Sequence, residues 1–383
     1  MYTDGDKPMT TGGKGTTMAG TWMKWAGAGL ALSMMAAGAA QAQDAVAAAE
    51  ADLANYTSIP TFTAPGEPFD AKACMAGKRI LSVPASSAVP FVATINKAMA
   101  GIAETVGFEY QIWENQGQPT QWVQGIEFGV SNQFDLIDLL AGVDPRVLEP
   151  QIKAARDAGA IVTASHLTGH EQPVPGGLTA SIPIDYKQAG KLLAEWAIAK
   201  TDGKANALVL VTNEVLSTDS MMAGIEEAFA TAPDSKFTVV NVSIPDWPTK
   251  IQANVQSAVI ADPTINYILP IYDGMNQFVV PALTITGASD RVKIATFNGT
   301  PFALDMVQNG QVEMNVGENL DWIAYGMLDA QMRLICGLDP VDDPKIPLLI
   351  FDANNAATAG TPAEVSKGYG DAYLAGYKEL WQL

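Results

Sequence analysis

The chain has 383 residues, of which 48% are hydrophobic, so it is long enough for two lobes and too apolar to be disordered over most of its length. Its formal net charge of -19 argues against nucleic-acid binding, which needs a basic surface. Two histidines and two cysteines are too few for a zinc framework or a dense disulfide scaffold.

The N-terminal segment has the pattern of an export signal. Lys24 precedes an apolar run at 25–40, and Ala-Gln-Ala at 40–42 forms a small-x-small cleavage site. We therefore expect a signal peptide over residues 1–42, cleaved after Ala42, and a periplasmic protein. The run is short and rich in Ala and Gly, which does not suit a permanent membrane span. An oxidising compartment permits a disulfide between Cys74 and Cys336, and two free buried thiols suit the sequence equally well.

Strands and helices alternate after an extension at 43–77, which we expect to be an extended arm on the surface. Strand-like apolar runs occur at 78–85, 108–113, 134–141, 160–165, 206–213, 236–244, 265–273, 292–300, 311–318 and 345–352. Helix-like segments occur at 91–106, 120–131, 143–159, 186–200, 219–230, 249–261, 275–284 and 320–336. This alternation predicts an α/β fold with parallel sheets, and so many strands favour two sheets in two lobes.

Three successive predicted strands end on polar side chains, Asp273, Asn298 and Glu318. The carboxyl ends of parallel strands meet at one edge of a sheet, where open α/β folds bind ligands. Each residue also has a structural interpretation: Asp273 as a helix N-cap, Asn298 as a turn residue before glycine, and Glu318 as a solvated loop acid. We expect these three side chains to contribute to a ligand site.

The C-terminal segment carries Tyr369, Tyr373, Tyr377 and Trp381 at a spacing of four residues. This spacing puts four aromatic rings on one face of a helix. We expect that face to pack against the body of the protein rather than to form a ligand cage.

Four stretches resemble the type I periplasmic binding proteins, in particular the ribose/galactose-binding family that serves ABC importers. They are residues 84–110, 181–197, 273–304 and 319–337. The resemblance implies a two-lobed α/β fold, in which each lobe is a parallel sheet flanked by helices, with three interlobe crossings near Ser181, Asn319 and Ile346. It divides the chain into a first lobe of 78–180 with 320–345, and a second lobe of 181–319 with 346–383.

The resemblance also implies a set of solute-binding positions. They are Ser87, Phe91, Ser165, His166, Met221, Trp247, Tyr272, Asp273, Asn298 and Glu318. An aromatic ring at Phe91 suits the apolar face of a sugar. Ser165-His166 replaces the Asp-Arg pair that the family often carries, and Met221 replaces an arginine, so Met221 suits packing better than recognition. Trp247 also suits a hydrophobic staple before a helix.

The resemblance implies a periplasmic substrate-binding protein that captures a small solute by hinge closure. We expect a monosaccharide or polyol, although two acids beside aromatic rings also suit a cationic or aromatic solute. The expected partner of this monomer is an ABC transporter permease, with a chemoreceptor or sensor kinase as a further possibility. A rival function is a secreted glycoside hydrolase that uses Asp273 and Glu318 as its acid/base pair.

We expect neither a cofactor nor a metal. His166 and His170 have a spacing that would place both rings on one face of a helix, but Gly169 and the prolines that follow make a helix there unfavourable. His166 is better suited to hydrogen bonding at the rim of the solute site.

Overall fold

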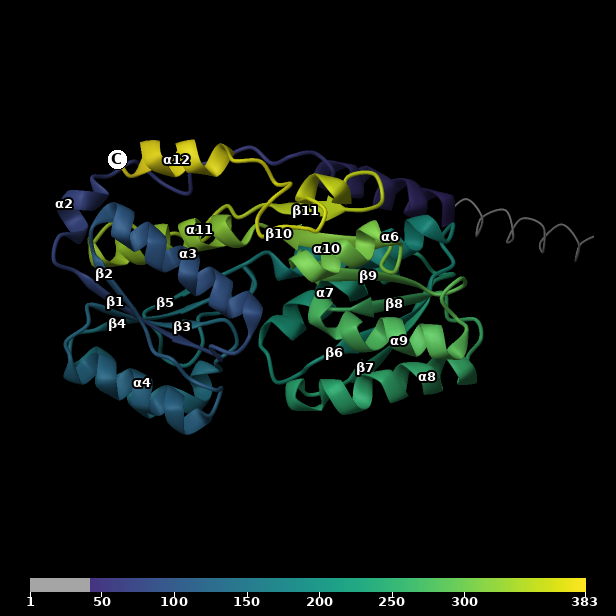
Figure 1. Cartoon of the computed structure of the whole chain (residues 1–383), viewed down its shortest axis with the longest axis horizontal. Helices are drawn as coiled ribbons and strands as arrows, with labels where there is room; N and C mark the ends of the chain where they lie inside the picture. The colour runs from purple at the N-terminus through teal and green to yellow at the C-terminus, as the bar shows by residue number, and fades with distance from the viewer. Residues whose placement is uncertain (1–41) are drawn as a thin grey trace, which may run out of the picture. The chain divides into compact units, whose positions relative to one another are not determined.

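A computed structural model describes residues 42–383, and all of the predicted signal peptide except its last residue, Ala42, lies outside the described residues. The described chain forms two separate sheets (Figure 1). The first has the strand order β2-β1-β3-β4-β5 and the second has the order β11-β10-β9-β8-β6-β7. Paired strands run parallel except β10 and β11, which are antiparallel. The α/β fold with two helix-flanked sheets, predicted from the sequence, is confirmed.

The strands of the first sheet are β1 (Arg79–Pro84), β2 (Glu109–Ile112), β3 (Leu136–Leu140), β4 (Ile161–Ser165) and β5 (Ala180–Ile182). Those of the second are β6 (Asn206–Val211), β7 (Lys236–Asn241), β8 (Tyr267–Pro270), β9 (Lys293–Asn298), β10 (Met314–Glu318) and β11 (Leu348–Phe351). The helices are α2 (Ala71–Met75), α3 (Pro90–Val106), α4 (Pro119–Ser131), α5 (Glu149–Asp157), α6 (Tyr186–Lys200), α7 (Ser217–Thr231), α8 (Gln252–Ala261), α9 (Asn276–Thr286), α10 (Pro301–Gln308), α11 (Leu320–Ile335) and α12 (Ala372–Leu380).

Helix α3 illustrates how the sequence determines an element. Pro90 occupies the first turn, where a missing N–H costs nothing. Ile95, Met99 and Val106 are buried on one face of the helix. Gly107 adopts φ 99° and its N–H bonds to the carbonyl of residue 103, which ends the helix. The helix therefore begins, packs and ends where its residue types require, and it places Phe91 in its first turn.

The chain crosses between the sheets more than once. Strand β5 pairs with β4 in the first sheet, and α6 then packs on the second sheet. After β10, helix α11 returns to the first lobe and packs on α3 and β4, before β11 joins the second sheet beside β10. Because β11 enters directly from the other lobe, its direction is not constrained by a βαβ crossover, and it pairs antiparallel.

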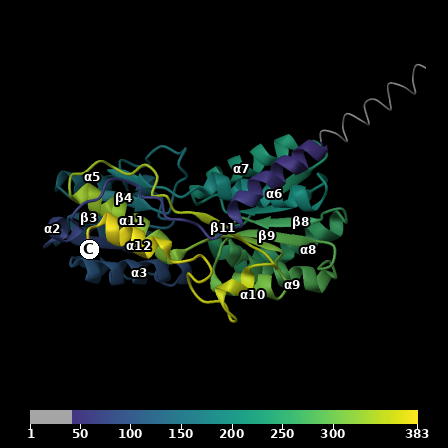
Figure 2. The ribbon, with the colours of Figure 1, turned by 90° about the horizontal axis from the view of Figure 1, so that it is seen from above.

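The N-terminal extension differs from the extended arm expected from the sequence. Residues 42–53 are helical, and Ala45, Ala49 and Leu53 are buried. Asp52 accepts hydrogen bonds from Lys191 at 2.9 Å and Gln188 at 3.1 Å, both on α6. The alanine-rich composition favours a helix with one apolar face, so the expectation of an extended conformation is wrong for this part. Figure 2 shows this purple helix along α6.

A disulfide joins Cys74 of α2 to Cys336 at the end of α11, with 5.9 Å between their Cα atoms.

The C-terminal tail packs on α11. The ring of Tyr325 stacks on those of Tyr377 and Trp381, with centroid distances of 5.2 and 5.3 Å. The sequence grouped residues 346–383 with the second lobe, but α12 lies against the first. In the described chain no helix is both long and apolar enough to cross a membrane.

Only two of the four aromatic residues predicted to share one helical face lie on α12. Tyr373 and Tyr377 are buried on α12, and Trp381 follows directly after it. Tyr369 lies before the helix, because Gly368 and Gly370, with φ of 96° and 76°, separate it from α12. The expectation of one helical face for all four rings is therefore wrong for Tyr369.

A buried carboxylate in β3 makes stability depend on pH. The Asp138 Oδ1 accepts hydrogen bonds from Thr163 at 2.7 Å and Ser165 at 2.8 Å, whereas Oδ2 has no partner in the described chain. Burial raises the pKa of Asp138 to about 6. The protonated form is therefore favoured in the folded state, and the stability that it contributes is lost as pH rises from about 4 through 6.

Asp138→Asn should remove this loss. The variant should unfold with a free energy about 3 kcal/mol higher than wild type at pH 7.5, and similar to wild type at pH 4. Urea titrations at both pH values measure the difference. Asp262→Asn is the control, because hydrogen bonds from Thr264 and Asn206 lower the pKa of Asp262 to about 2, below this window. An Asp138→Asn curve parallel to wild type between pH 4 and 7.5 would contradict the assignment.

Candidate functional site

The candidate site lies where strands of both sheets end. Asn298 and Glu318 are the last residues of β9 and β10, and His166 directly follows β4 of the first sheet. His166 adopts φ 55°, the left-handed conformation that turns the chain out of the strand. These three residues are almost fully buried, and His166 of the first lobe forms a hydrogen bond with Glu318 of the second.

His166 connects the two lobes through both ring nitrogens. Its Nε2 lies 2.7 Å from Glu318 Oε1, and its Nδ1 lies 2.6 Å from the hydroxyl oxygen of Tyr186. Burial holds the pKa of Tyr186 well above its ordinary value, so the phenol keeps its proton and can donate it to Nδ1. An imidazole with its own proton on Nε2 then donates to Glu318. This hydrogen-bonded chain fixes the ring between the sheets.

Glu318 has one engaged and one free carboxylate oxygen. Oε1 accepts a hydrogen bond from His166 and a second one from the Nδ2 of Asn298, which lies 3.4 Å from it. Oε2 is buried and has no hydrogen-bond partner among residues 42–383. A buried carboxylate oxygen without a donor is costly in the folded protein. It is therefore the atom of this site best suited to receive a hydrogen bond from a ligand.

Asp273 does not cap the turn that it begins. Its Oδ2 accepts from the backbone N–H and the hydroxyl of Thr300, at 2.9 and 2.7 Å, and from the Nδ2 of Asn315 at 3.4 Å. The side chain thus joins the end of β8 to the start of α10. Burial raises the pKa of Asp273 to about 6, and the neighbouring charge of Glu318 makes a smaller contribution in the same direction.

Aromatic rings border the histidine. The ring of Phe91 is tilted against His166, with centroids 5.0 Å apart, and Tyr186 contacts the same histidine edge-on at 5.4 Å. Phe91 is only partly buried, unlike His166. The structure therefore brings together Phe91, His166, Asn298 and Glu318. Asp273 lies near enough for the charge of Glu318 to affect its pKa.

The other predicted positions engage different partners. Tyr272 bonds through its hydroxyl to Ser217 at 2.7 Å, and Trp247 packs near it, with ring centroids 6.5 Å apart. Ser165 donates to Asp138 inside the first lobe. The remaining two are Met221, fully buried in the core, and Ser87, whose Oγ accepts the backbone N–H of residue 115.

Sequence reasoning missed three residues that shape the site. Tyr186 was expected only as the first residue of a helix, and Asn315 only as part of a strand. Thr300 was expected only as the last residue of a strand run. Their hydrogen bonds to His166 and Asp273 join residues that lie 20 to 42 positions apart, and no local pattern signals such partners.

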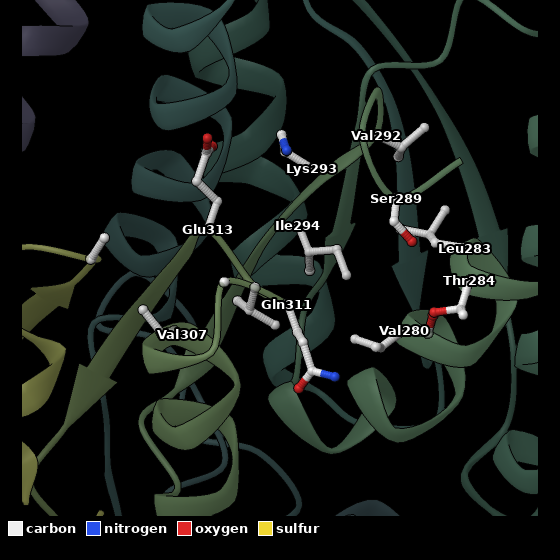
Figure 3. Close-up of a pocket in the computed structure, with 13 residues that line it drawn as sticks. Val280, Leu283, Thr284, Ser289, Val292, Lys293, Ile294, Val307, Gln311 and Glu313 are labelled. Carbon is white, nitrogen blue, oxygen red and sulfur yellow. The ribbon is translucent and has the colours of Figure 1, made fainter. Parts of the chain in front are cut away.

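A surface cavity lies at the other end of the second sheet (Figure 3). It is lined by side chains of α9, the start of β9, the end of α10 and the residues before β10, among them Leu283, Lys293, Val307 and Glu313. Strand β9 begins at this cavity and ends at Asn298, so the cavity is separate from the candidate site. In residues 42–383 no group of three or more His, Cys, Asp or Glu side chains is placed to hold a metal ion.

Residues 80–339 match the model of a family described as a periplasmic binding protein domain. Solved structures share the fold at low identity. A solute-binding protein of Agrobacterium vitis with bound allitol is 19% identical and has a TM-score of 0.65, with 74% of this chain and 97% of that chain covered. A Caulobacter myo-inositol binding protein is 16% identical with a TM-score of 0.65, at 76% and 97% coverage. A Burkholderia graminis protein in complex with D-arabinose is 21% identical with a TM-score of 0.64, at 73% and 96% coverage. No curated protein matches the sequence.

Proposed function

The chain belongs to the family of periplasmic binding protein domains, and on this premise we propose that it binds a small sugar or polyol between its lobes and delivers it to an ABC transporter permease. The observation that carries the proposal is the meeting of His166 and Glu318, from different sheets, with the second carboxylate oxygen of Glu318 left free. A solute that bonds to this oxygen is held by the same carboxylate that bonds to His166 of the other lobe.

The chemistry of the site suits a hydroxylated solute. A carboxylate accepts hydrogen bonds from sugar hydroxyls, and an aromatic ring such as Phe91 covers the apolar C–H face of a sugar. Allitol, myo-inositol and D-arabinose are the ligands named for proteins that share this fold. These points support a neutral sugar or polyol over the cationic or aromatic solute that the sequence also allowed.

Hinge closure is supported by further contacts between the lobes. The loop after β4 reaches α7 of the second lobe, where Glu171 accepts a hydrogen bond from the hydroxyl of Ser220. Beside it, the Nε2 of Gln172 donates to the backbone carbonyl of Leu216 at 2.9 Å. Ligand contacts to both lobes select a closed arrangement, because only that arrangement lets all of them form together.

We further propose that the protein acts in the periplasm as a monomer, after cleavage behind Ala42, and that it binds its solute without turnover. The rival hydrolase needs two carboxylates at its reacting centre. In this chain the Oδ2 of Asp273 is already engaged by Thr300, and the Oε1 of Glu318 by His166. This arrangement suits recognition better than acid/base catalysis. A chemoreceptor or sensor kinase remains a further partner for the loaded protein.

A thermal-shift screen tests the proposal. The compounds are allitol, myo-inositol, D-arabinose, D-allose, a choline-type amine and an aromatic acid. A sugar or polyol at a hundred times its dissociation constant should stabilise the protein by about 2.7 kcal/mol, whereas the amine and the acid should not. Chromatography of the best ligand after incubation should return it unchanged. A screen in which only the amine or the acid stabilises the protein would refute the neutral-solute proposal, and release of a free sugar from a glycoside would refute binding without turnover.

A further inference from the structure

The C-terminal tail, residues 340–383, extends beyond the residues that match the family domain. In Figures 1 and 2 this yellow segment forms β11 and then passes over α11 as α12. Tyr369 lies in this segment before α12 and is 1% exposed. Its ring contacts Phe351 of β11 edge-on, with centroids 4.9 Å apart. This contact directs the tyrosine toward the ends of β9 and β10.

Two glycines show where the hydroxyl of Tyr369 lies. A Cβ atom added at Gly299 or at Gly317 would be 2.2 Å from this oxygen, so only glycine fits at either position. Gly299 directly follows Asn298, and Gly317 directly precedes Glu318. The tail hydroxyl therefore touches the backbone beside two residues of the candidate site.

This hydroxyl has no hydrogen-bond partner in the described chain, although it is buried. Two acceptors of the same region are also buried and unpaired, Glu318 Oε2 and Asn315 Oδ1. Asp273 and Glu318 lie close enough for their charges to raise the pKa of Tyr369, in addition to the larger effect of burial. Burial of an unpaired donor and of two unpaired acceptors in the same region costs folding free energy, and a bound group that both accepts and donates a hydrogen bond would remove part of this cost.

We infer that the tail supplies a solute-binding residue, in which the Tyr369 hydroxyl donates to a hydroxyl group of the solute that in turn donates to Glu318 Oε2. This inference rests on the proposed function and narrows it. A sugar or polyol hydroxyl accepts one hydrogen bond and donates another, whereas an ammonium group only donates. The tail thus selects hydroxylated over cationic solutes.

The test compares Tyr369→Phe with Tyr377→Phe. Tyr377 is a matched control, because its hydroxyl is also buried and unpaired, but it lies on α12 between Phe62 and Trp381. Both variants keep the aromatic ring and lose an unpaired hydroxyl, so both should keep or raise the melting temperature without solute. With the best sugar or polyol of the screen, calorimetry should show about tenfold weaker binding for Tyr369→Phe and unchanged binding for Tyr377→Phe.

The outcomes separate this inference from the proposal on which it rests. Wild-type affinity in Tyr369→Phe overturns the role of the tail alone. A lower melting temperature without solute in Tyr369→Phe, but not in Tyr377→Phe, also overturns it, because the hydroxyl would then serve the fold. If no sugar or polyol of the screen binds the wild-type protein, the proposed function and this inference both fail.

Discussion

Glu318→Ala should bind its sugar or polyol about 100-fold more weakly than the wild-type protein, because the substitution removes one partner of a buried hydrogen-bonded pair together with a carboxylate oxygen that has no partner in the described chain. It also leaves the buried Nε2–H of His166 without its acceptor, which weakens the contact between the lobes. Isothermal titration calorimetry measures the loss directly. The melting temperature without solute shows whether the variant is folded.

Glu313→Gln is the matched control for this experiment. Glu313 directly precedes β10, whereas Glu318 ends it, and Glu313 bonds to Trp196 at 2.9 Å and to Tyr267. A glutamine there keeps an acceptor for both partners at the opposite end of the sheet. Its affinity for the solute should equal that of wild type. Equal affinities for Glu318→Ala and Glu313→Gln would place the solute elsewhere in the molecule.

Loss of the disulfide should have the largest effect on stability. The bond joins residues 262 positions apart, so it restricts a very long loop of the unfolded chain. In the chain-entropy model, Cys74→Ser with Cys336→Ser should lower the free energy of unfolding by about 5 kcal/mol. Urea unfolding should show a lower midpoint for the double variant.

Reduction provides the control for the disulfide. Wild-type protein treated with dithiothreitol should unfold at the same urea concentration as the double variant, and dithiothreitol should not affect the variant itself. If reduced and oxidised wild-type protein have equal midpoints, the bond does not stabilise the fold.

Much of the fold could be predicted from the sequence because its strands are buried on both faces. Strands β1, β3, β6 and β9 are almost entirely buried, and such strands appear in a sequence as continuous apolar runs. Helix α6 occupies the residues predicted for it, since the side chain of Asp185 caps its first turn.

The gathering of the candidate site could be predicted only in part. Asn298 and Glu318 meet because neighbouring parallel strands end at the same edge, a rule that needs no coordinates. The partners from elsewhere could not be predicted. Tyr186 reaches His166, and Tyr369 reaches two glycines, through tertiary contacts that leave no periodic signal. For Tyr369 the four-residue spacing was misleading, because Gly368 and Gly370 on either side of it separate it from α12, which begins at Ala372.

The two terminal segments change what opening of the lobes requires. The tail packs through α12 on α11 of the first lobe and through Tyr369 on β9 and β10 of the second. The N-terminal segment binds α6 of the second lobe through Asp52, and α11 of the first through Cys74. Both segments therefore contact both lobes and connect them in addition to the three interlobe crossings. Any opening of the lobes must therefore break the contacts of these two segments or carry the segments along, in addition to bending the three crossings.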